Sequence, residues 1–381
     1  MLPFHKEASE NPIFVPNSSS TYRSPTQNFE EVHWEAGFTY NPSIVVKDDK
    51  IFMLYRAQED IGTPSTIGLA VSEDGVHFER MFSEPVLYPT LPFKDLEVGG
   101  CEDPRVVQRE DGTYIMMYTG YDGVSVARLM VATSKDLVTW KKYGKAFGDN
   151  EPSNPYHNDA PTWSKSAAIV STLNPLDGSV TATKLHLPSL SEKPVYGMFF
   201  GDNSIYFALS EDLIHWKFVS KENVKGSDIR SSTTTTTDSR HVIVGDDSED
   251  AMPIINPRSK MFDSWLCESG PAALVTPQGI LLVYNGANVD EDNPDFDPHA
   301  TPNAYATGQL LVSHSNPFDV LDRLDLPFLI VDEEYESEGQ VDEVVFVEGF
   351  AYFNLQFWLY YGTADTYVGV ATKKDLVDLR L

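Results

Sequence analysis

The chain has few cysteines and no long apolar run. Only Cys101 and Cys267 occur among 381 residues, too few for a disulfide framework, and we expect both to be buried free thiols. No apolar stretch reaches the roughly 18 residues of a membrane-spanning helix. The segment Met1–Lys6 has no apolar core of a signal peptide. We therefore expect a cytoplasmic protein, or a periplasmic or secreted one if a signal peptide has been removed.

Basic residues are also scarce. Lysine and arginine number 28 against 57 aspartates and glutamates, which gives a net charge of −29. Nucleic acids and anionic membranes bind basic surfaces, so neither is an expected partner. The chain has no Gly-x-Ser-x-Gly nucleophile motif, no glycine-rich phosphate loop and no Cys/His metal spacing. We expect no metal and no organic cofactor.

A phrase of about a dozen residues recurs along the chain. Each copy is an apolar run that ends in Ser or Thr, and the clearer copies continue to Asp and a closing aromatic residue. The copies begin at Ile67, Leu129, Ile205, Leu310 and Val368. A phrase that recurs every few tens of residues indicates stacked supersecondary units.

Each copy follows a pair of apolar runs that are separated by a short polar turn. Turns occur at Asp48-Asp49, Glu110–Gly112, Pro277–Gly279 and Glu348-Gly349, and a longer linker joins Ala167–Val170 to Val195–Phe200. Such turns between β-branched and aromatic runs are typical of hairpins. Five units of about four strands predict an all-β, five-bladed β-propeller.

The predicted propeller forms a single domain over residues 1–381. It has an N-terminal extension over about 1–30 and loop insertions at about 225–255 and 288–302. Helix should be rare, with short pieces near the N-terminus and around Phe318–Leu321. The N-terminal residues 1–26 could dock on a second copy of the chain, so a homo-oligomer is also an expectation.

Polar residues recur just before the innermost strand of each unit. In a propeller these positions converge at one end of the central channel. Each cluster taken alone also suits an ordinary turn, but a Glu-Asp-Pro-Arg sequence that enters a buried strand has to desolvate charges, which is costly unless they pair or bind a ligand. The clusters are Asn41-Pro42, Glu102–Arg105, Lys165-Ser166, Glu268–Pro271 and Gln340–Glu343.

Further candidates stand at the inner ends of the hairpins. Arg56, Asp202, Asn285 and Asp365 each follow an apolar run there. Neighbouring aromatic residues could stack on sugar rings or could simply belong to the core. They are Tyr40, Tyr55, Phe200, Tyr284 and Tyr361. Several carboxylates with a few cations suggest carbohydrate chemistry, because glycoside hydrolysis uses two carboxyl groups.

The ordered set of these motifs resembles glycoside hydrolase family 130, whose members are five-bladed propellers that act on β-mannosides. The resemblance runs from Asn41 to Ala371 and is strongest in two segments, Leu54-Tyr55-Arg56-Ala57 and Gly99-Gly100-Cys101-Glu102-Asp103-Pro104-Arg105. It continues through Arg128, Lys165-Ser166-Ala167-Ala168, Glu268-Ser269-Gly270-Pro271, Tyr284-Asn285-Gly286 and Tyr360-Tyr361-Gly362-Thr363-Ala364-Asp365.

The resemblance implies roles for individual residues. Asp103 would be the general acid, acting through a sugar hydroxyl, and Arg56, Asp103 and Asp365 would hold the mannose ring. Glu268 would act as the base through water, with Asp202 at the position of a second hydrolase glutamate. The remaining candidates for substrate binding are Asn41, Glu102, Arg105, Arg128, Lys165 and Asn285.

The family contains both inverting hydrolases and phosphorylases. Arg128 and Lys165 match positions that can bind phosphate, but phosphorylases tend to have His at position 285 and a small residue at position 268. We therefore expect an inverting, exo-acting β-mannosidase that acts on β-1,2-linked mannosides. The alternatives are a β-mannoside phosphorylase that releases mannose 1-phosphate and a non-catalytic glycan-binding propeller.

Overall fold

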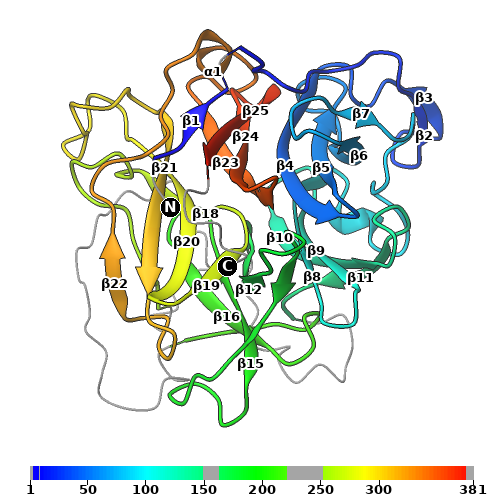
Figure 1. Cartoon of the computed structure of the whole chain (residues 1–381). Coiled ribbons are helices and arrows are strands. Elements are labelled where there is room, and N and C mark those ends of the chain that lie inside the picture. The colour runs from blue at the N-terminus through cyan, green and yellow to red at the C-terminus, as the bar shows by residue number, and fades with distance from the viewer. Residues whose placement is uncertain (1–2, 8, 149–162, 221–251, 375–381) are drawn as a thin grey trace.

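The computed structural model describes residues 3–7, 9–148, 163–220 and 252–374 (Figure 1). Regular structure within these ranges is almost entirely β. The described part has 25 strands, a short 3-10 turn at Lys94–Leu96 and one α-helix, α1 (Glu334–Ser337). The all-β prediction is confirmed.

The five sequence repeats form five antiparallel groups of strands around a common centre (Figure 1). The first repeat contains β4 (Phe38–Lys47), β5 (Lys50–Gln58), β6 (Thr66–Ser72) and β7 (Glu79–Arg80). The second contains β8 (Gly100–Gln108), β9 (Tyr114–Tyr121), β10 (Ala127–Ser134) and β11 (Lys141–Lys145). The third contains β12 (Ala168–Leu173), β13 (Val180–Ala182), β14 (Lys184–Leu185), β15 (Val195–Phe200), β16 (Tyr206–Ser210) and β17 (Lys217–Phe218).

The fourth and fifth repeats complete the series. The fourth contains β18 (Leu266–Ser269), β19 (Ala273–Thr276), β20 (Gly279–Ala287), β21 (Tyr305–Val312) and β22 (Val320–Arg323). The fifth contains β23 (Val345–Phe353), β24 (Gln356–Thr363) and β25 (Tyr367–Lys374), and the N-terminal strand β1 (His5–Lys6) pairs with β25. The strands β2 (Tyr22–Ser24) and β3 (Glu30–Val32) pair with each other.

Hydrogen bonds also cross between repeats. β12 pairs in parallel with β19, and β13 pairs in parallel with β8, so that the second, third and fourth repeats join in one 15-stranded sheet. The first and fifth repeats form separate four-stranded sheets. These sheets do not by themselves establish a closed ring of five separate blades. The five-bladed propeller and the single-domain division therefore stay predictions.

The innermost strands of all five repeats nevertheless meet. One small cavity is lined by residues of each repeat, among them Ser43, Arg105, Ala167, Pro271 and Glu348. The cavity is about 20 Å³ in volume. Residues that precede these strands are thereby brought close together, as the sequence predicted.

The recurrent Ser-x-Asp phrase ends the third strand of a repeat. The Ser134 hydroxyl accepts hydrogen bonds from the backbone N–H groups of Asp136 and Leu137, and the Asp136 carboxylate accepts two more from Val138 and Thr139. Equivalent bonds surround Ser72-Glu73-Asp74 and Ser210-Glu211-Asp212. Side-chain oxygens that satisfy these donors favour a turn over a longer strand.

Two local predictions were wrong. The fifth hairpin turns at Asn354-Leu355, which have φ of 51° and 59°, and not at Glu348-Gly349. Positive φ at both central residues suits the twist of a two-residue hairpin, while Glu348 belongs to a bulge inside β23. The expected short helices are not found either: Val320 begins the edge strand β22, and the described residues near the N-terminus form strands β1–β3 and no helix.

The predicted loop insertions have different outcomes. Most of the insertion at 225–255 lies outside the described residues, which resume at Met252. The loop at 288–302 is tied down by Asn288, whose carboxamide donates to the carbonyl of Asp297 at 3.1 Å and accepts from its N–H at 3.1 Å.

A tyrosine on the middle strand of four repeats donates to a buried carboxylate, and that carboxylate also pairs with a basic side chain. The tyrosines offered as sugar-stacking residues in three of these repeats (Tyr55, Tyr284 and Tyr361) are thus core residues with satisfied hydroxyls. The four sets are Tyr55–Glu35–Arg80, Tyr118–Glu97–Lys142, Tyr284–Asp263–Arg323 and Tyr361–Glu336–Lys6.

Candidate active site

Backbone bulges aim the candidate side chains. The register of β8 shifts between Glu102 and Arg105, and Asp103 between them has φ of 49°. In β4 the register shifts between Tyr40 and Ser43, and Asn41 has φ of 46°. Bulges commonly re-aim a side chain next to an active site, and positive φ at a residue other than glycine is held only where its surroundings over-determine it.

Arg56 holds two neighbouring carboxylates. Its guanidinium donates to Asp103 at 3.0 Å and to Glu102 at 2.8 Å, and it lies over the Tyr40 ring at 4.8 Å. Asn41 donates its side-chain amide to the same Asp103 oxygen at 3.0 Å. Residues from the first two repeats thus form one polar cluster around Asp103.

Lys165 extends this cluster to the fourth repeat. Its ammonium nitrogen is 3.8 Å from an Asp103 oxygen and 3.8 Å from a Glu268 oxygen, so these two carboxylate oxygens lie at most twice that distance apart. Ser166, with φ of 57°, donates its hydroxyl to Glu268. An inverting pair of carboxyl groups stands about 6.5–9.5 Å apart, and the upper limit set by Lys165 is compatible with the lower part of that window.

Two further aspartates contribute charge to this cluster. Asp365 has φ of 48°, and burial raises its pKa to about 6 even though Arg56 opposes the shift. Asp103 and Glu102 contribute to the electrostatic field at Asp365. Asp202 accepts a hydrogen bond from the Trp163 indole at 3.0 Å, and its charge acts on both Lys165 and Glu268.

The carboxylates of the cluster have different pKa shifts. Burial raises the pKa of Glu268 to about 7, with Lys165 opposing the shift and Asp202 adding to it. Burial would also raise the pKa of Asp103, but Arg56 and Lys165 outweigh it and hold that pKa well below its usual range. Burial lowers the affinity of Lys165 for its proton, yet Glu268 and Asp103 more than compensate and raise its pKa. Shifts of this size in a buried cluster are typical of functional sites.

Three predicted binding residues have other contacts. Arg105 is 4% exposed and its guanidinium donates to backbone carbonyls. Asn285 is fully buried, and its carboxamide pairs with both the N–H and the carbonyl of Val347. Arg128 pairs with Asp122 at 3.9 Å, and within the described ranges it makes no ion pair with the acidic cluster.

Sequence reasoning missed Glu348. Its side chain is fully buried, 2.8 Å from Arg105, and burial raises its pKa well above the usual range although Arg105 opposes the shift. The available signal was a single charged residue inside the apolar strand β23. The glycine that follows it gives the pair the composition of a turn, which hides this signal.

Other kinds of site are not supported in the described part of the chain. No group of three or more His, Cys, Asp or Glu side chains there could hold a metal ion. No helix of the described residues is long and apolar enough to cross a membrane. Both cysteines are buried free thiols, as expected.

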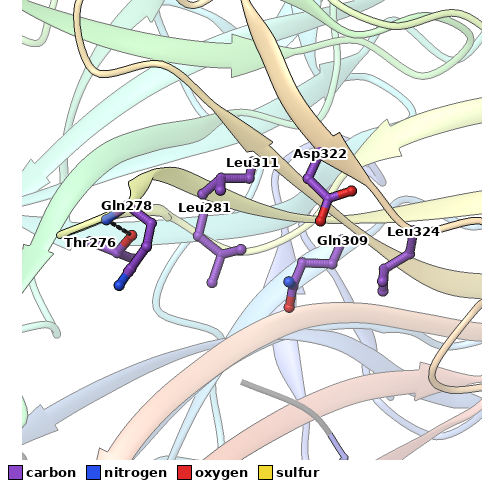
Figure 2. Close-up of a pocket in the computed structure, with 7 residues that line it drawn as sticks. All are labelled: Thr276, Gln278, Leu281, Gln309, Leu311, Asp322 and Leu324. Atoms are coloured by element: carbon purple, nitrogen blue, oxygen red, sulfur yellow. Dashed lines mark hydrogen bonds between the residues drawn. The ribbon is translucent and has the colours of Figure 1, made fainter.

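A surface pocket lies on the fourth repeat (Figure 2). It lies over β20–β22 and is lined by Leu281 and Leu311, which are paired residues of β20 and β21. The pair Asn285 and Thr307 lies four residues further along the same two strands. Asp322 is the one charged residue among those that line it, and it has no basic partner there. A lone carboxylate does not supply the two groups that glycoside cleavage uses.

Comparison with known proteins identifies the family. A sequence profile described as β-1,4-mannooligosaccharide phosphorylase, that of glycoside hydrolase family 130, matches residues 6–380. The chain belongs to glycoside hydrolase family 130. The resemblance that the sequence motifs suggested is therefore confirmed.

Two curated relatives of this family 130 chain are phosphorylases. A 1,2-β-oligomannan phosphorylase of Thermoanaerobacter sp. is 26% identical over 375 residues, covering 96% of each chain. A β-1,2-mannobiose phosphorylase of the same organism is 28% identical and covers 90% of this chain and 92% of that protein. These names agree with the phosphorylase alternative better than with the expected hydrolase.

Solved structures of the family are also similar. A glycosyl hydrolase from Bacteroides ovatus has a TM-score of 0.80 at 34% identity, with 97% of this chain and 93% of that chain covered. A second solved structure has a TM-score of 0.80 at 33% identity, with the same coverage. It is described by the finding that the GH130 family of mannoside phosphorylases contains glycoside hydrolases that target β-1,2 mannosidic linkages in Candida mannan. The chain is thus a glycoside-active enzyme of a family that contains both reaction types.

Proposed function

We propose that this chain is an inverting, exo-acting β-mannosidase that uses water to cleave β-1,2-linked mannosides. The supporting observation is the charge balance around Lys165. Its ammonium group already faces Asp103 and Glu268, and Glu102, Asp202 and Asp365 add further carboxylates nearby. A phosphate dianion needs a pocket of free cationic donors, and this cluster would repel it.

The proposed mechanism gives each carboxylate a role. Asp103 supplies the proton to the leaving oxygen, and Glu268 accepts a proton from the attacking water. The Ser166 hydroxyl donates to one oxygen of Glu268, and the Lys165 ammonium lies 3.8 Å from that same oxygen. Asn41, Arg56 and Asp365 surround Asp103 and would bind hydroxyl groups of the mannose ring.

Phosphorolysis is the second candidate. The named activities of the curated relatives favour it, and Lys165 would then contact phosphate. It requires that substrate or phosphate displace Lys165 from at least one carboxylate. Arg128 would also have to leave Asp122, with which it pairs at 3.9 Å.

Product analysis separates the candidates. The protein is incubated with β-1,2-mannobiose with and without inorganic phosphate, and the products are separated by chromatography. We expect free mannose at equal rates in both conditions. Mannose 1-phosphate that forms only with phosphate would overturn the hydrolase proposal in favour of the phosphorylase. Saccharide binding without turnover of any β-mannoside would indicate a glycan-binding protein.

Asp103→Asn tests the proposed acid. The variant keeps the size of the side chain but cannot donate a carboxyl proton, and general acid catalysis contributes about 10²–10⁴-fold. We expect a fall of that order in kcat for mannobiose. Asp95→Asn, at an exposed position, is the matched control. Unchanged turnover in Asp103→Asn would refute the role.

A further inference from the structure

The guanidinium of Arg105 is hydrogen-bonded to the backbone next to both proposed catalytic carboxylates, Asp103 and Glu268. It donates to the carbonyl of Asp103 at 3.2 Å, to that of Ser269 at 3.0 Å and to that of Gly270 at 3.0 Å. Ser269 directly follows Glu268. One rigid, planar group therefore joins the chain segments that hold the two carboxylates, although they lie in the second and fourth repeats.

The backbone at Asp103 needs such a contact. Its φ of 49° is uncommon for a residue other than glycine, and it departs from the extended backbone that a following proline, here Pro104, favours. Strain of this kind persists only where neighbouring groups fix the backbone. The Arg105 hydrogen bond to the Asp103 carbonyl lies at the bulge itself.

Glu348 fixes the guanidinium in turn. It reaches Arg105 at 2.8 Å from the bulge in β23, and neither side chain is more than 4% exposed. An arginine fork presents its donors in one plane, so an ion pair on one side and carbonyls on the others leave it a single orientation. The contact brings the fifth repeat into the same unit.

These contacts leave little of Arg105 for a ligand. Three of its five N–H groups donate to backbone carbonyls, one terminal nitrogen also lies 2.8 Å from the Glu348 carboxylate, and the side chain is buried. We propose that Arg105, oriented by Glu348, is a positioning residue that holds Asp103 and Glu268 at the separation that mannoside cleavage requires. The proposal rests on the proposed function and replaces the expected role of Arg105 in substrate binding.

Arg105→Lys tests it. Lysine keeps the positive charge but cannot reach three carbonyls and a carboxylate at once. Misplacement of a catalytic group by about 1 Å can lower the rate by about 100-fold. We expect kcat to fall by about that factor while KM changes by less than about threefold, since the groups that bind the sugar are untouched. The limbs of the pH–rate profile should stay in place because the charge is retained.

The second variant, Glu348→Gln, replaces the carboxyl group that faces Arg105 with a carboxamide of the same shape. It leaves the three carbonyl bonds to Arg105 intact, so we expect a smaller loss in kcat, about tenfold, again with little change in KM. If Arg105→Lys does not fold, the kcat and KM of Glu348→Gln still test the positioning role. Arg109→Lys is the matched control, because Arg109 lies next to the end of the same strand and pairs with the exposed Asp111.

Each outcome is decisive. A raised KM with unchanged kcat in Arg105→Lys would mean that Arg105 binds the sugar. A lowered unfolding temperature with normal kcat and KM in both variants would mean a purely structural role. The ratio of variant to wild type is measured with whichever acceptor, water or phosphate, wild type uses, so a wrong acceptor overturns the proposed function without affecting this test. A wild type that cleaves no β-mannoside overturns both.

Discussion

Asp103 and Glu268 are buried carboxylates in one cluster, yet their pKa values move in opposite directions. Arg56, Lys165 and Arg105 all lower the pKa of Asp103. For Glu268 the cations that oppose the effect of burial are Lys165 and Arg105, and the nearby Asp202 adds to the upward shift. Without substrate, Glu268 is therefore protonated below about pH 7, whereas Asp103 is ionised. For Asp103 to act as the acid, bound mannoside must raise its pKa, which follows if the sugar separates it from Lys165 and excludes water.

The pH dependence of hydrolysis tests this assignment. Glu268 accepts a proton only when ionised, and its pKa is about 7, so kcat/KM should rise as the pH increases through 7. We expect Glu268→Gln to lower kcat/KM by about 10²–10⁴-fold and to abolish this limb. The rates are measured between pH 4 and pH 9, with Glu110→Gln as an exposed control. A rate that instead falls through pH 7 would make Glu268 the acid.

At the scale of the strand, the tyrosine–carboxylate–cation sets combine burial with polarity. Tyr284 on β20 donates to Asp263 at 2.7 Å and accepts from Arg323 at 3.1 Å. Cys267, the neighbour of Glu268, accepts from the same arginine at 3.1 Å. The set thus supports the strand that carries the proposed base. The third repeat lacks such a tyrosine at the end of β15, where Phe199 and Phe200 stand.

Tyr284→Phe tests the contribution of one such set. The change leaves the ring but removes a buried hydroxyl that donates to a charged group, which costs about 1.5–3 kcal/mol. We expect the free energy of unfolding to fall by that amount in a chemical denaturation experiment. Tyr367→Phe, on β25 and partly exposed, should change it by less than about 0.5 kcal/mol. Equal effects of the two changes would contradict the interpretation.

Across the whole molecule, the N-terminal segment is joined to the last repeat. β1 pairs with β25, and the Lys6 ammonium lies 2.6 Å from Glu336, whose side chain is fully buried. The contact joins residues 330 positions apart. An N-terminal strand that completes the C-terminal sheet closes the chain upon itself and removes an open edge from that sheet.

Lys6→Ala should destabilise the whole fold. Removal of one partner leaves the Glu336 charge buried, at a cost of about 3–5 kcal/mol. Burial raises the pKa of Glu336, with Lys6 opposing the shift, so loss of Lys6 raises it further and the variant loses stability as the pH rises through that value. Thermal unfolding should therefore show a deficit at pH 8 that is smaller at pH 5. Lys6→Ala with Glu336→Gln should recover part of it; no recovery would contradict the buried-charge argument.

Local signals made much of the fold and the site predictable. Turn residues such as Asp48-Asp49 and Ser-x-Asp phrases act within a few residues, so they are legible in the sequence. The same holds for Asn41, Asp103, Lys165 and Glu268, each at the same place in its repeat. The fifth hairpin was misplaced because Glu348-Gly349 has the composition of a turn, while burial made it a bulge.

The sequence by itself determined the number of repeats, the all-β class and the family, because alternation, turn chemistry and motif order are local properties. Only the tertiary structure decided how the charges pair. Arg105 contacts Ser269, which is 164 residues away in the sequence, and lies 2.8 Å from Glu348 of the fifth repeat. No pattern of spacing specifies which cation meets which carboxylate. The pKa of Glu268 likewise depends on burial and on Lys165 from another repeat, and both arise only when the repeats converge.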